Sequence, residues 1–399
     1  MSGRSDAAAP RAQTGPLLAA GAALLAIALL AADQGGARPA LATLIGGVAG
    51  LALYHAGFGF TAAWRRIVRE RRGAGLRAQM LLIFLACCLS FPLMDGWLAP
   101  WGLTMSGWIL PLGAASAFGA FLFGAGMQLG GGCASGTLFT AGGGSVRMGV
   151  TLAAFVAGSV WATAHWDVWA ALPRMGGGSL LRMTGGPAPA LAAMAALTGG
   201  LWALSAWVER RAHGALEVPR RTGSWLHGPW SLAAGALALV LVCWATFAVL
   251  GRPWGVTSAF ALWGAKVAAA GGVEVQAWTY WSGWRAGALQ RSVFADATSV
   301  MNLGIVAGAM AAAALAGKWR PSARLSARDL ATAVIGGLAM GYGARLAYGC
   351  NIGAYLGGLV SGSLHGIWWL VWGFAGSALG VYARGLLAMD PPLAPRPAV

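Results

Sequence analysis

The chain has 399 residues, of which 58% are hydrophobic and only 10% are charged. Because soluble domains carry roughly a quarter charged residues, this composition excludes an ordinary soluble domain and predicts an all-α polytopic membrane protein. The formal net charge of +16 does not indicate nucleic acid as a partner. The arginines lie between hydrophobic segments, where the positive-inside tendency accounts for most of them.

The first half of the chain is expected to cross the lipid bilayer six times. Residues 1–14 form a polar tail, and the Ala-rich segment after it could pass for a signal peptide, although we interpret it as a helix that is retained. Arginines within residues 64–72 form the strongest positive cluster and predict a cytoplasmic loop. The expected spans are 16–32, 39–60, 78–94, 106–129, 147–165 and 188–208, with a short apolar piece at 137–141.

The second half is expected to add four spans. A basic linker at 209–228 separates the first half (15–208) from the second (229–388), and a tail follows at 389–399. The linker holds Arg210, Arg211, Arg220 and Arg221, and a third basic loop lies at 318–328. Residues 257–283 are apolar but interrupted, so we expect short or re-entrant helices there. The expected spans are 229–250, 293–316, 330–347 and 364–387. With all basic loops inside, both termini are cytoplasmic.

Two stretches share a pattern of glycines around one cysteine. Aligned on Cys133 and Cys350, residues 124–136 and 341–353 are identical at six of thirteen positions. A helix cannot run through so many glycines without cost, so the backbone is expected to break at both places. A broken helix is tolerated in a bilayer only where its freed N–H and C=O groups face protein or a wet cavity. We therefore expect the two breaks to meet near the midplane and to line a path for a solute.

The predicted topology gives the two motifs opposite orientations. The Cys133 hairpin connects at the cytoplasmic side and the Cys350 hairpin at the external side, as in transporters built from inverted repeats. A second pair of similar sequences agrees with this topology: residues 59–64 resemble residues 255–260, at an offset of 196 positions rather than the 217 of the cysteine motifs. The second half therefore holds about 21 extra residues between its two motifs, in the Trp-rich stretch around 278–284.

These breaks permit a particular chemistry. An anion in hydrocarbon faces a large desolvation cost unless dipoles or charges replace its water, and helix N-termini supply N–H donors and positive dipole ends. A thiol is a weak donor with a soft acceptor sulfur, which suits a sulfur-bearing solute, and we expect both thiols to be neutral because a thiolate repels an anion. The predicted path residues are Cys133, Cys350, Gly132, Gly349, Gly136, Gly353, Asn351, Gln128 and Arg345.

Polar residues near the breaks have more than one interpretation. Gln128 and Arg345 lie five residues before the two cysteines. Arg345 is placed to attract an anion, or to snorkel or pair with a carboxylate such as Asp296. Asn351 is expected to cap the short helix after Cys350.

The remaining reactive side chains are expected to be structural. Lys266 and Glu274 are interpreted as a mutual pair in preference to a proton relay. The other cysteines lie within spans and are expected to pack: Cys87, Cys88 and Cys243. The histidines have no metal-ligand spacing, and the chain contains no Walker loop, paired catalytic carboxylates or Cys-x-x-Cys motif. The sequence therefore predicts neither an enzyme nor an ATP-driven pump, and no metal or cofactor.

At the two cysteine motifs, residues 126–140 and 348–354, the sequence resembles the YeeE/YedE family of bacterial inner-membrane proteins, the sulfur-transport group. The similarity extends over residues 40–388. The resemblance implies an hourglass-shaped bundle of inverted repeats with short helices pointing at its centre. It also implies uptake of thiosulfate past cysteine thiols, with Cys133 and Cys350 matching two of the relay cysteines.

The chain departs from that pattern in one respect. The thiosulfate importers carry a further cysteine in the Gly-aromatic turn of the first repeat, which here reads Gly57-Phe-Gly-Phe60. Uptake of a small sulfur-containing anion, with thiosulfate as first candidate, is the function expected. The alternatives are a membrane sulfur relay with persulfide-carrying cysteines, transport of a selenium-containing or other small inorganic anion, and a structural scaffold. A cytoplasmic sulfur-carrier protein is a candidate partner.

Overall fold

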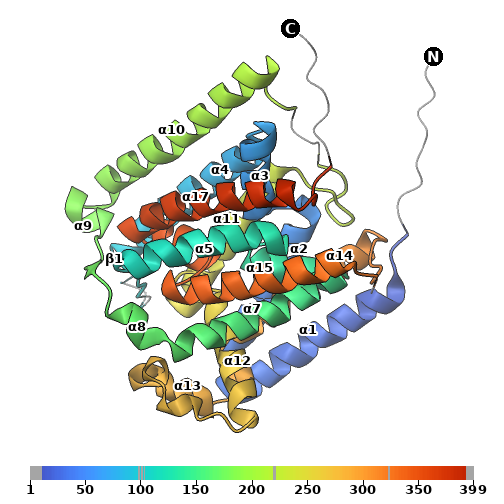
Figure 1. The fold of residues 1–399 in the computed structure, drawn as a ribbon, viewed down its shortest axis with the longest axis vertical. Helices are drawn as coiled ribbons and strands as arrows, with labels where there is room; N and C mark the ends of the chain where they lie inside the picture. Colours follow the sequence, from blue (N-terminus) through green and yellow to red (C-terminus); the bar gives the residue numbers. More distant parts are fainter. Residues whose placement is uncertain are drawn as a thin grey trace.

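A computed structural model describes residues 11–97, 99, 102, 104–218, 222–321 and 324–391, which form helices packed side by side (Figure 1). The first half contains α1 (Thr14–Gly35), α2 (Ala37–Ala56), α3 (Phe60–Glu70), α4 (Ala74–Met94), α5 (Ala114–Gly130), α6 (Ala134–Gly142), α7 (Val146–Ala164), α8 (Trp166–Ala170), α9 (Leu180–Thr184) and α10 (Pro187–His213). The second contains α11 (Leu232–Leu250), α12 (Thr257–Ala270), α13 (Ala286–Gln290), α14 (Ala297–Leu315), α15 (Ala327–Leu346), the π-helix η6 (Asn351–Leu356), α16 (Gly357–Val360) and α17 (Leu364–Leu386).

Short elements complete the fold. Strands β1 (Leu112–Gly113) and β2 (Arg174–Met175) pair antiparallel. The segment between α12 and α14 contains the 3-10 helices η2 (Val275–Ala277), η3 (Thr279–Trp281), η4 (Gly283–Arg285) and η5 (Val293–Ala295). We refer to residues 271–296 as the Trp-rich segment. The equivalent link between α3 and α4 is only residues 71–73, so the extra length expected in the second half lies where the sequence predicts it.

Within the described residues, 10 helices are long and apolar enough to cross a membrane. They match the ten expected crossings one for one, which confirms an all-α polytopic membrane protein. Two details of the prediction are wrong. Residues 64–70 are not a loop but part of α3, and residues 106–111 are not helical because α5 begins only at Ala114. Residues 1–10 and 392–399 of the predicted tails, and Arg220 and Arg221 of the linker, lie outside the described residues.

The helices of the two halves pack in equivalent pairs. α5 contacts α17 as α15 contacts α7, and α3 contacts α17 as α12 contacts α7. The α4–α11 contact corresponds to the α14–α2 contact. The α5–α15 and α2–α11 contacts each join a helix of one half to its equivalent in the other half. The helices α2 to α7 therefore correspond, in order, to α11, α12, α14, α15, η6 with α16, and α17. α1 and α10 lie outside this repeat, and α10 runs along the outer edge of the bundle (Figure 1).

The two repeats have opposite directions. Arg147, at the start of α7, donates to the Gly130 carbonyl at the end of α5 and to Thr332 near the start of α15. At the other end of the pair, Gly119 near the start of α5 packs against Leu346 at the end of α15. α5 and α15 are therefore antiparallel neighbours, which is the geometry of an inverted repeat.

Glycine allows the repeats to interlock. In the α5–α17 crossing, a Cβ added to Gly376 would overlap the Phe121 carbonyl oxygen. In the α2–α14 crossing, a Cβ on Gly46 would overlap the Met301 carbonyl oxygen. Such backbone-to-backbone approach is typical of membrane helices, which have no hydrophobic effect to hold them together within lipid.

One end of the bundle collects arginines. The buried Glu209 carboxylate forms ion pairs with Arg77 and Arg72, with N···O distances of 2.7 Å and 3.2 Å. Arg384, near the end of α17, donates to the Gln128 carbonyl at 2.7 Å and pairs with Asp390. We call this end, where α3, α5, α10 and α17 finish and α4, α7 and α15 begin, the arginine-rich face. By the positive-inside tendency, this is the face that the sequence predicts to be cytoplasmic.

Candidate functional site

Cys133 lies where the chain turns back into the bundle. The last carbonyls of α5 accept hydrogen bonds from Arg147 and Arg384, which satisfies helix-end groups that would otherwise lack partners. Gly131 then takes a left-handed conformation (φ 93°), and α6 begins at Ala134 with Cys133 as its N-cap residue. The Cys133 side chain is only 1% exposed. The predicted helix break is therefore present and places this thiol in the core.

Cys350 has the equivalent position in the second repeat. α15 ends at Leu346, Tyr348 takes a left-handed conformation (φ 58°), and Cys350 is the N-cap residue of η6. Its side chain is fully buried. Both cysteines thus start a short helix directly after a reversal of the chain.

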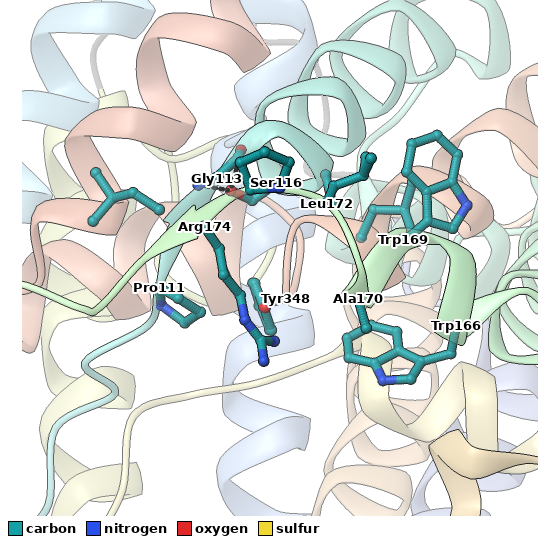
Figure 2. Close-up of a pocket in the computed structure, with 13 residues that line it drawn as sticks. Pro111, Gly113, Ser116, Trp166, Trp169, Ala170, Leu172, Arg174 and Tyr348 are labelled. Atoms are coloured by element: carbon teal, nitrogen blue, oxygen red, sulfur yellow. Dashed lines mark hydrogen bonds between the residues drawn. The ribbon is translucent and has the colours of Figure 1, made fainter.

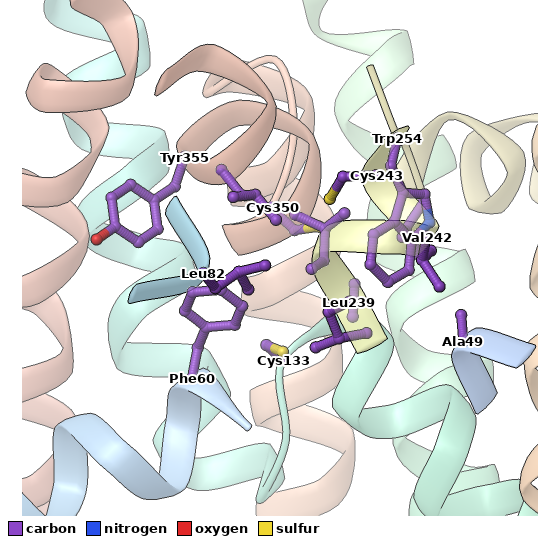
Figure 3. Close-up of a cluster of buried hydrophobic side chains, with 14 of the residues drawn as sticks. Ala49, Phe60, Leu82, Cys133, Leu239, Val242, Cys243, Trp254, Cys350 and Tyr355 are labelled. Carbon is purple, nitrogen blue, oxygen red and sulfur yellow. The ribbon is translucent and has the colours of Figure 1, made fainter. Parts of the chain in front are cut away.

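The two thiols belong to one cluster of buried side chains, which Figure 3 draws. Its labelled members include Phe60, Leu82, Cys133, Leu239, Val242, Cys243, Trp254, Cys350 and Tyr355. These side chains come from α3, α4 and α11, from the link between α11 and α12, and from the start of the two short helices, so both repeats contribute to the cluster. The sequence prediction that the two breaks converge agrees with this packing.

Short helices begin at this cluster and run outward. α3 begins at Phe60, whose ring lies 5.8 Å from the Tyr355 ring of η6. α3 and α6 then run toward the arginine-rich face, whereas α12 and η6 with α16 run toward the opposite face. The positive ends of the helix dipoles of α3, α6 and α12 therefore point toward the middle of the bundle, which favours an anion there.

Gln128 and Arg345 have matching environments. The fully buried Gln128 amide donates to the Thr61 carbonyl at 3.1 Å and to Ser377 Oγ at 2.8 Å. Arg345, also buried, donates to Thr257 Oγ1 at 2.6 Å and to the Tyr280 hydroxyl at 3.0 Å. Thr61 and Thr257 are themselves equivalent in the match between residues 59–64 and 255–260. The repeat thus extends to polar contacts.

Two expectations about polar pairs are wrong, and so is one of the alternatives for Arg345. Asn351 does not cap its helix: neither of its side-chain polar atoms has a partner among the described residues. Arg345 does not pair with Asp296, whose carboxylate instead caps α14 by accepting from Ser299. Lys266 donates to the carbonyls of Leu289 and Arg291 rather than pairing with Glu274. Arg345 and Lys266 found hydroxyls and backbone carbonyls that sequence spacing did not reveal.

The other cysteines differ among themselves. The Cys87 thiol is buried and donates to the Leu359 carbonyl at 3.6 Å, which supports a packing role. Cys87 and Cys243 both belong to the same cluster as Cys133 and Cys350, and Figure 3 draws Cys243, on α11, near Cys350. Nothing in the sequence around Cys243 marked it, because it has no glycine break and no counterpart in the other repeat.

Sequence reasoning also missed Thr257, Tyr280 and Tyr355. Tyr355 is fully buried and its ring stacks on Trp369 at 5.9 Å, while its hydroxyl has no partner among the described residues. Thr257 lies in the matched residues 255–260, but its contact with Arg345 depends on how α12 and α15 meet in the fold. Within the part of the chain that the structure describes, no group of three or more His, Cys, Asp or Glu side chains could hold a metal ion.

A pocket opens beside the end of α15, away from the arginine-rich face (Figure 2). Arg174 and Tyr348 lie close together in it, with Trp166 and Trp169 on one side. Its lining contains no acidic side chain: Pro111, Leu112, Gly113, Ala115, Ser116, Trp166, Trp169, Ala170, Leu172, Pro173, Arg174, Leu346 and Tyr348. The Tyr348 ring is 6.2 Å from Trp166. Tyr348, which lines the pocket, is two positions before Cys350 in the chain.

Inverted repeats, interrupted helices and a buried centre define the architecture of a membrane transport protein. Comparison with known families agrees: a family model described as "Sulphur transport" matches residues 55–379, and the chain belongs to that family. The sequence is also similar to proteins named "Probable transporter YedE" from Salmonella typhimurium and Escherichia coli, each 32% identical over 142 residues. That match covers 36% of this chain and 35% of each relative. The resemblance to the YeeE/YedE family is thereby confirmed.

Proposed function

We propose that this protein transports a small sulfur-containing anion, with thiosulfate as first candidate, along a central path between the two faces of the bundle. The observation that carries the proposal is the burial of Cys133 and Cys350 in one cluster. They belong to two oppositely directed repeats, so the thiols lie where a path that uses both repeats has to pass. The family and the YedE relatives, named as transporters, support the class of function.

The physical demand on such a path is replacement of the anion's water. The dipoles of α3, α6 and α12 offer positive ends without a full charge at the centre. Thiols offer weak S–H donors and polarisable sulfur, a closer match to a sulfur-terminated anion than to one that carries only oxygen. Gly132 and Gly349 pack against the backbone at the start of the two short helices, where a Cβ would lie 3.2 Å from Gly136 and 2.8 Å from Ala354. Gly136 and Gly353 add no side-chain bulk beside each thiol, so a solute could approach the backbone there closely.

The burial of both thiols, at 1% and 0% exposure, argues against direct sulfur exchange with a protein partner. Thiol–disulfide-type chemistry needs access to the sulfur. A cytoplasmic sulfur carrier, if it acts, would receive the solute at the arginine-rich face.

The test is uptake of labelled thiosulfate by proteoliposomes. We expect the unmodified protein to take up the label, and C133A and C350A each to reduce the initial rate at least 100-fold. C88A, on the half-buried thiol of α4, is the matched control and should retain uptake. Full uptake by the double variant C133A/C350A would overturn the proposal. A stable persulfide on either cysteine after incubation with thiosulfate, formed when the thiolate attacks the outer sulfur and sulfite leaves, would favour a sulfur relay instead; mass spectrometry of the protein and a sulfite assay detect it.

A further inference from the structure

Arg345 is a buried cation with neutral partners. It is 6% exposed, and its two terminal nitrogens donate to the hydroxyls of Thr257 and Tyr280. Its Nε has no partner among the described residues, and none of the ion pairs found there includes Arg345. A guanidinium held within a membrane-spanning bundle is costly unless an opposite charge balances it.

The contacts of Arg345 lead to a second donor group. Thr257 is the first residue of α12, a helix of 14 residues whose N-cap Val256 offers no side-chain hydrogen bond. The first N–H groups of a helix lack intrahelical acceptors and bind anions readily. The guanidinium and the start of α12 therefore converge on one point from two different helices.

Tyr280 covers Arg345 and the start of α12 on the side of the Trp-rich segment. It comes from η3 in the Trp-rich segment, the part of the second repeat that the first repeat lacks. Its ring packs edge-on against Trp166 at 5.2 Å, and the Arg285 guanidinium lies 4.4 Å from its centre. Trp166 also lines the pocket that contains Arg174 and Tyr348 (Figure 2). The pocket and Arg345 are therefore separated by one aromatic layer.

The repeat provides an internal comparison. The equivalent position on the arginine-rich side holds Gln128, a neutral amide bonded to the backbone carbonyl of Thr61. The two equivalent side chains thus share a geometry but differ in charge. The buried Arg384 beside Gln128 is paired with Asp390, whereas none of the ion pairs among the described residues includes Arg345.

We propose that Arg345, Thr257 and Tyr280, with the start of α12, form a capture site for a small oxyanion. The site receives the solute from the side of the Trp-rich segment and passes it to Cys350. The ligand class is a doubly charged tetrahedral sulfur oxyanion, so sulfate competes for this site even though it has no terminal sulfur for the thiols. Gln128 at the other end binds the same solute weakly and releases it. The inference rests on the proposed transport function and names its first binding step.

The experiment measures labelled thiosulfate uptake in proteoliposomes over a range of concentrations, with and without sulfate in the external solution. We expect R345Q, which copies the Gln128 end, to raise the KM at least 10-fold and to weaken sulfate inhibition by a similar factor. R345K keeps the charge and should recover part of both effects. Y280F removes one hydroxyl and should raise the KM about threefold. R291Q is the matched control, an exposed arginine of the same segment, and should change neither value.

The outcomes separate this inference from the transport proposal. No uptake by the unmodified protein defeats the transport function itself. Normal uptake with an unchanged KM and unchanged sulfate inhibition in R345Q defeats the capture site alone. If R345Q does not reach the membrane, Y280F decides: an unchanged KM and unchanged sulfate inhibition in Y280F then overturn the inference. C350A should lower the maximal rate in every case, which distinguishes passage past the thiol from capture.

Discussion

Gln128 and Arg345 occupy the same place in two inverted repeats, and each side chain donates to the threonine near the start of the neighbouring short helix. The acceptor is a backbone carbonyl at Thr61 and a hydroxyl at Thr257. Equivalent positions thus carry a neutral amide in one repeat and a full charge in the other. If the proposed anion path passes both positions, this difference predicts unequal affinity at its two ends.

Cys243 tests how many thiols the path uses. Its buried side chain packs in the cluster of Cys133 and Cys350, but no chain break accompanies it. We expect C243A to cost about 1–2 kcal/mol of stability through the small cavity it leaves, and to keep the thiosulfate uptake rate within twofold. The measurements are thermal unfolding in detergent and uptake in liposomes. A folded C243A protein without uptake would make Cys243 a third path thiol.

The α5–α17 crossing depends on the absence of a side chain at Gly376, because a Cβ there would overlap the Phe121 carbonyl. We expect G376A to destabilise the protein by about 1–3 kcal/mol, the usual cost of overpacking, and to lower the unfolding temperature. Gly149 in α7 is the matched control, since a Cβ there would meet nothing within 4 Å. G149A should be neutral or stabilising, because alanine favours a helix by up to about 1 kcal/mol over glycine. Equal unfolding temperatures for the two variants would contradict this account of the crossing.

Glu209 holds the arginine-rich face together. Its buried carboxylate forms an ion pair with Arg77 and accepts hydrogen bonds from Arg72 and from the backbone N–H of Gly73. E209Q leaves the Arg77 charge buried without its counterion, and we expect a loss of about 3–5 kcal/mol. E70Q is the control, since the Glu70–Arg66 pair is about one-third exposed, and it should cost less than about 1 kcal/mol. Detergent-solubilised protein unfolded by heat provides the comparison, and equal losses in the two variants would refute this role.

Asp390 follows α17 and forms an ion pair with Arg384 in the last turn of that helix. Hydrogen bonds from Arg384 hold the pKa of the Asp390 carboxyl below its ordinary value of 3.8. Because the folded pKa is lowered, the stabilisation is complete above about pH 4 and is lost as the pH falls through the folded pKa. We expect D390N to lower the unfolding temperature at pH 7, by an amount equivalent to about 1.5–3 kcal/mol. The difference from the unmodified protein should shrink below pH 4, and a difference that stays constant to pH 3 would contradict the assignment.

Much of the architecture follows from the sequence. Ten apolar runs of membrane-spanning length predict the ten long helices, because a bilayer leaves a chain few other ways to satisfy its backbone. The paired Gly-rich cysteine motifs predict two helix breaks, since glycine both weakens a helix and allows the reversals seen at Gly131 and beside Tyr348. Opposite directions for the two halves follow from the basic loops. The helix α3 was missed, because its arginines suggested a loop although an amphipathic helix carries them equally well.

What only the tertiary structure decided is which side chains meet. Side-chain partners depend on helix rotation and on crossings hundreds of residues apart in the chain, and neither leaves a local signal. Arg345 therefore found the hydroxyls of Thr257 and Tyr280 instead of Asp296, and Asn351 did not become a cap. Residue types and spacing determined the membrane class, the helix count and the two breaks. Packing alone brought Cys133, Cys243 and Cys350 into one cluster and left a buried positive charge at one end of it.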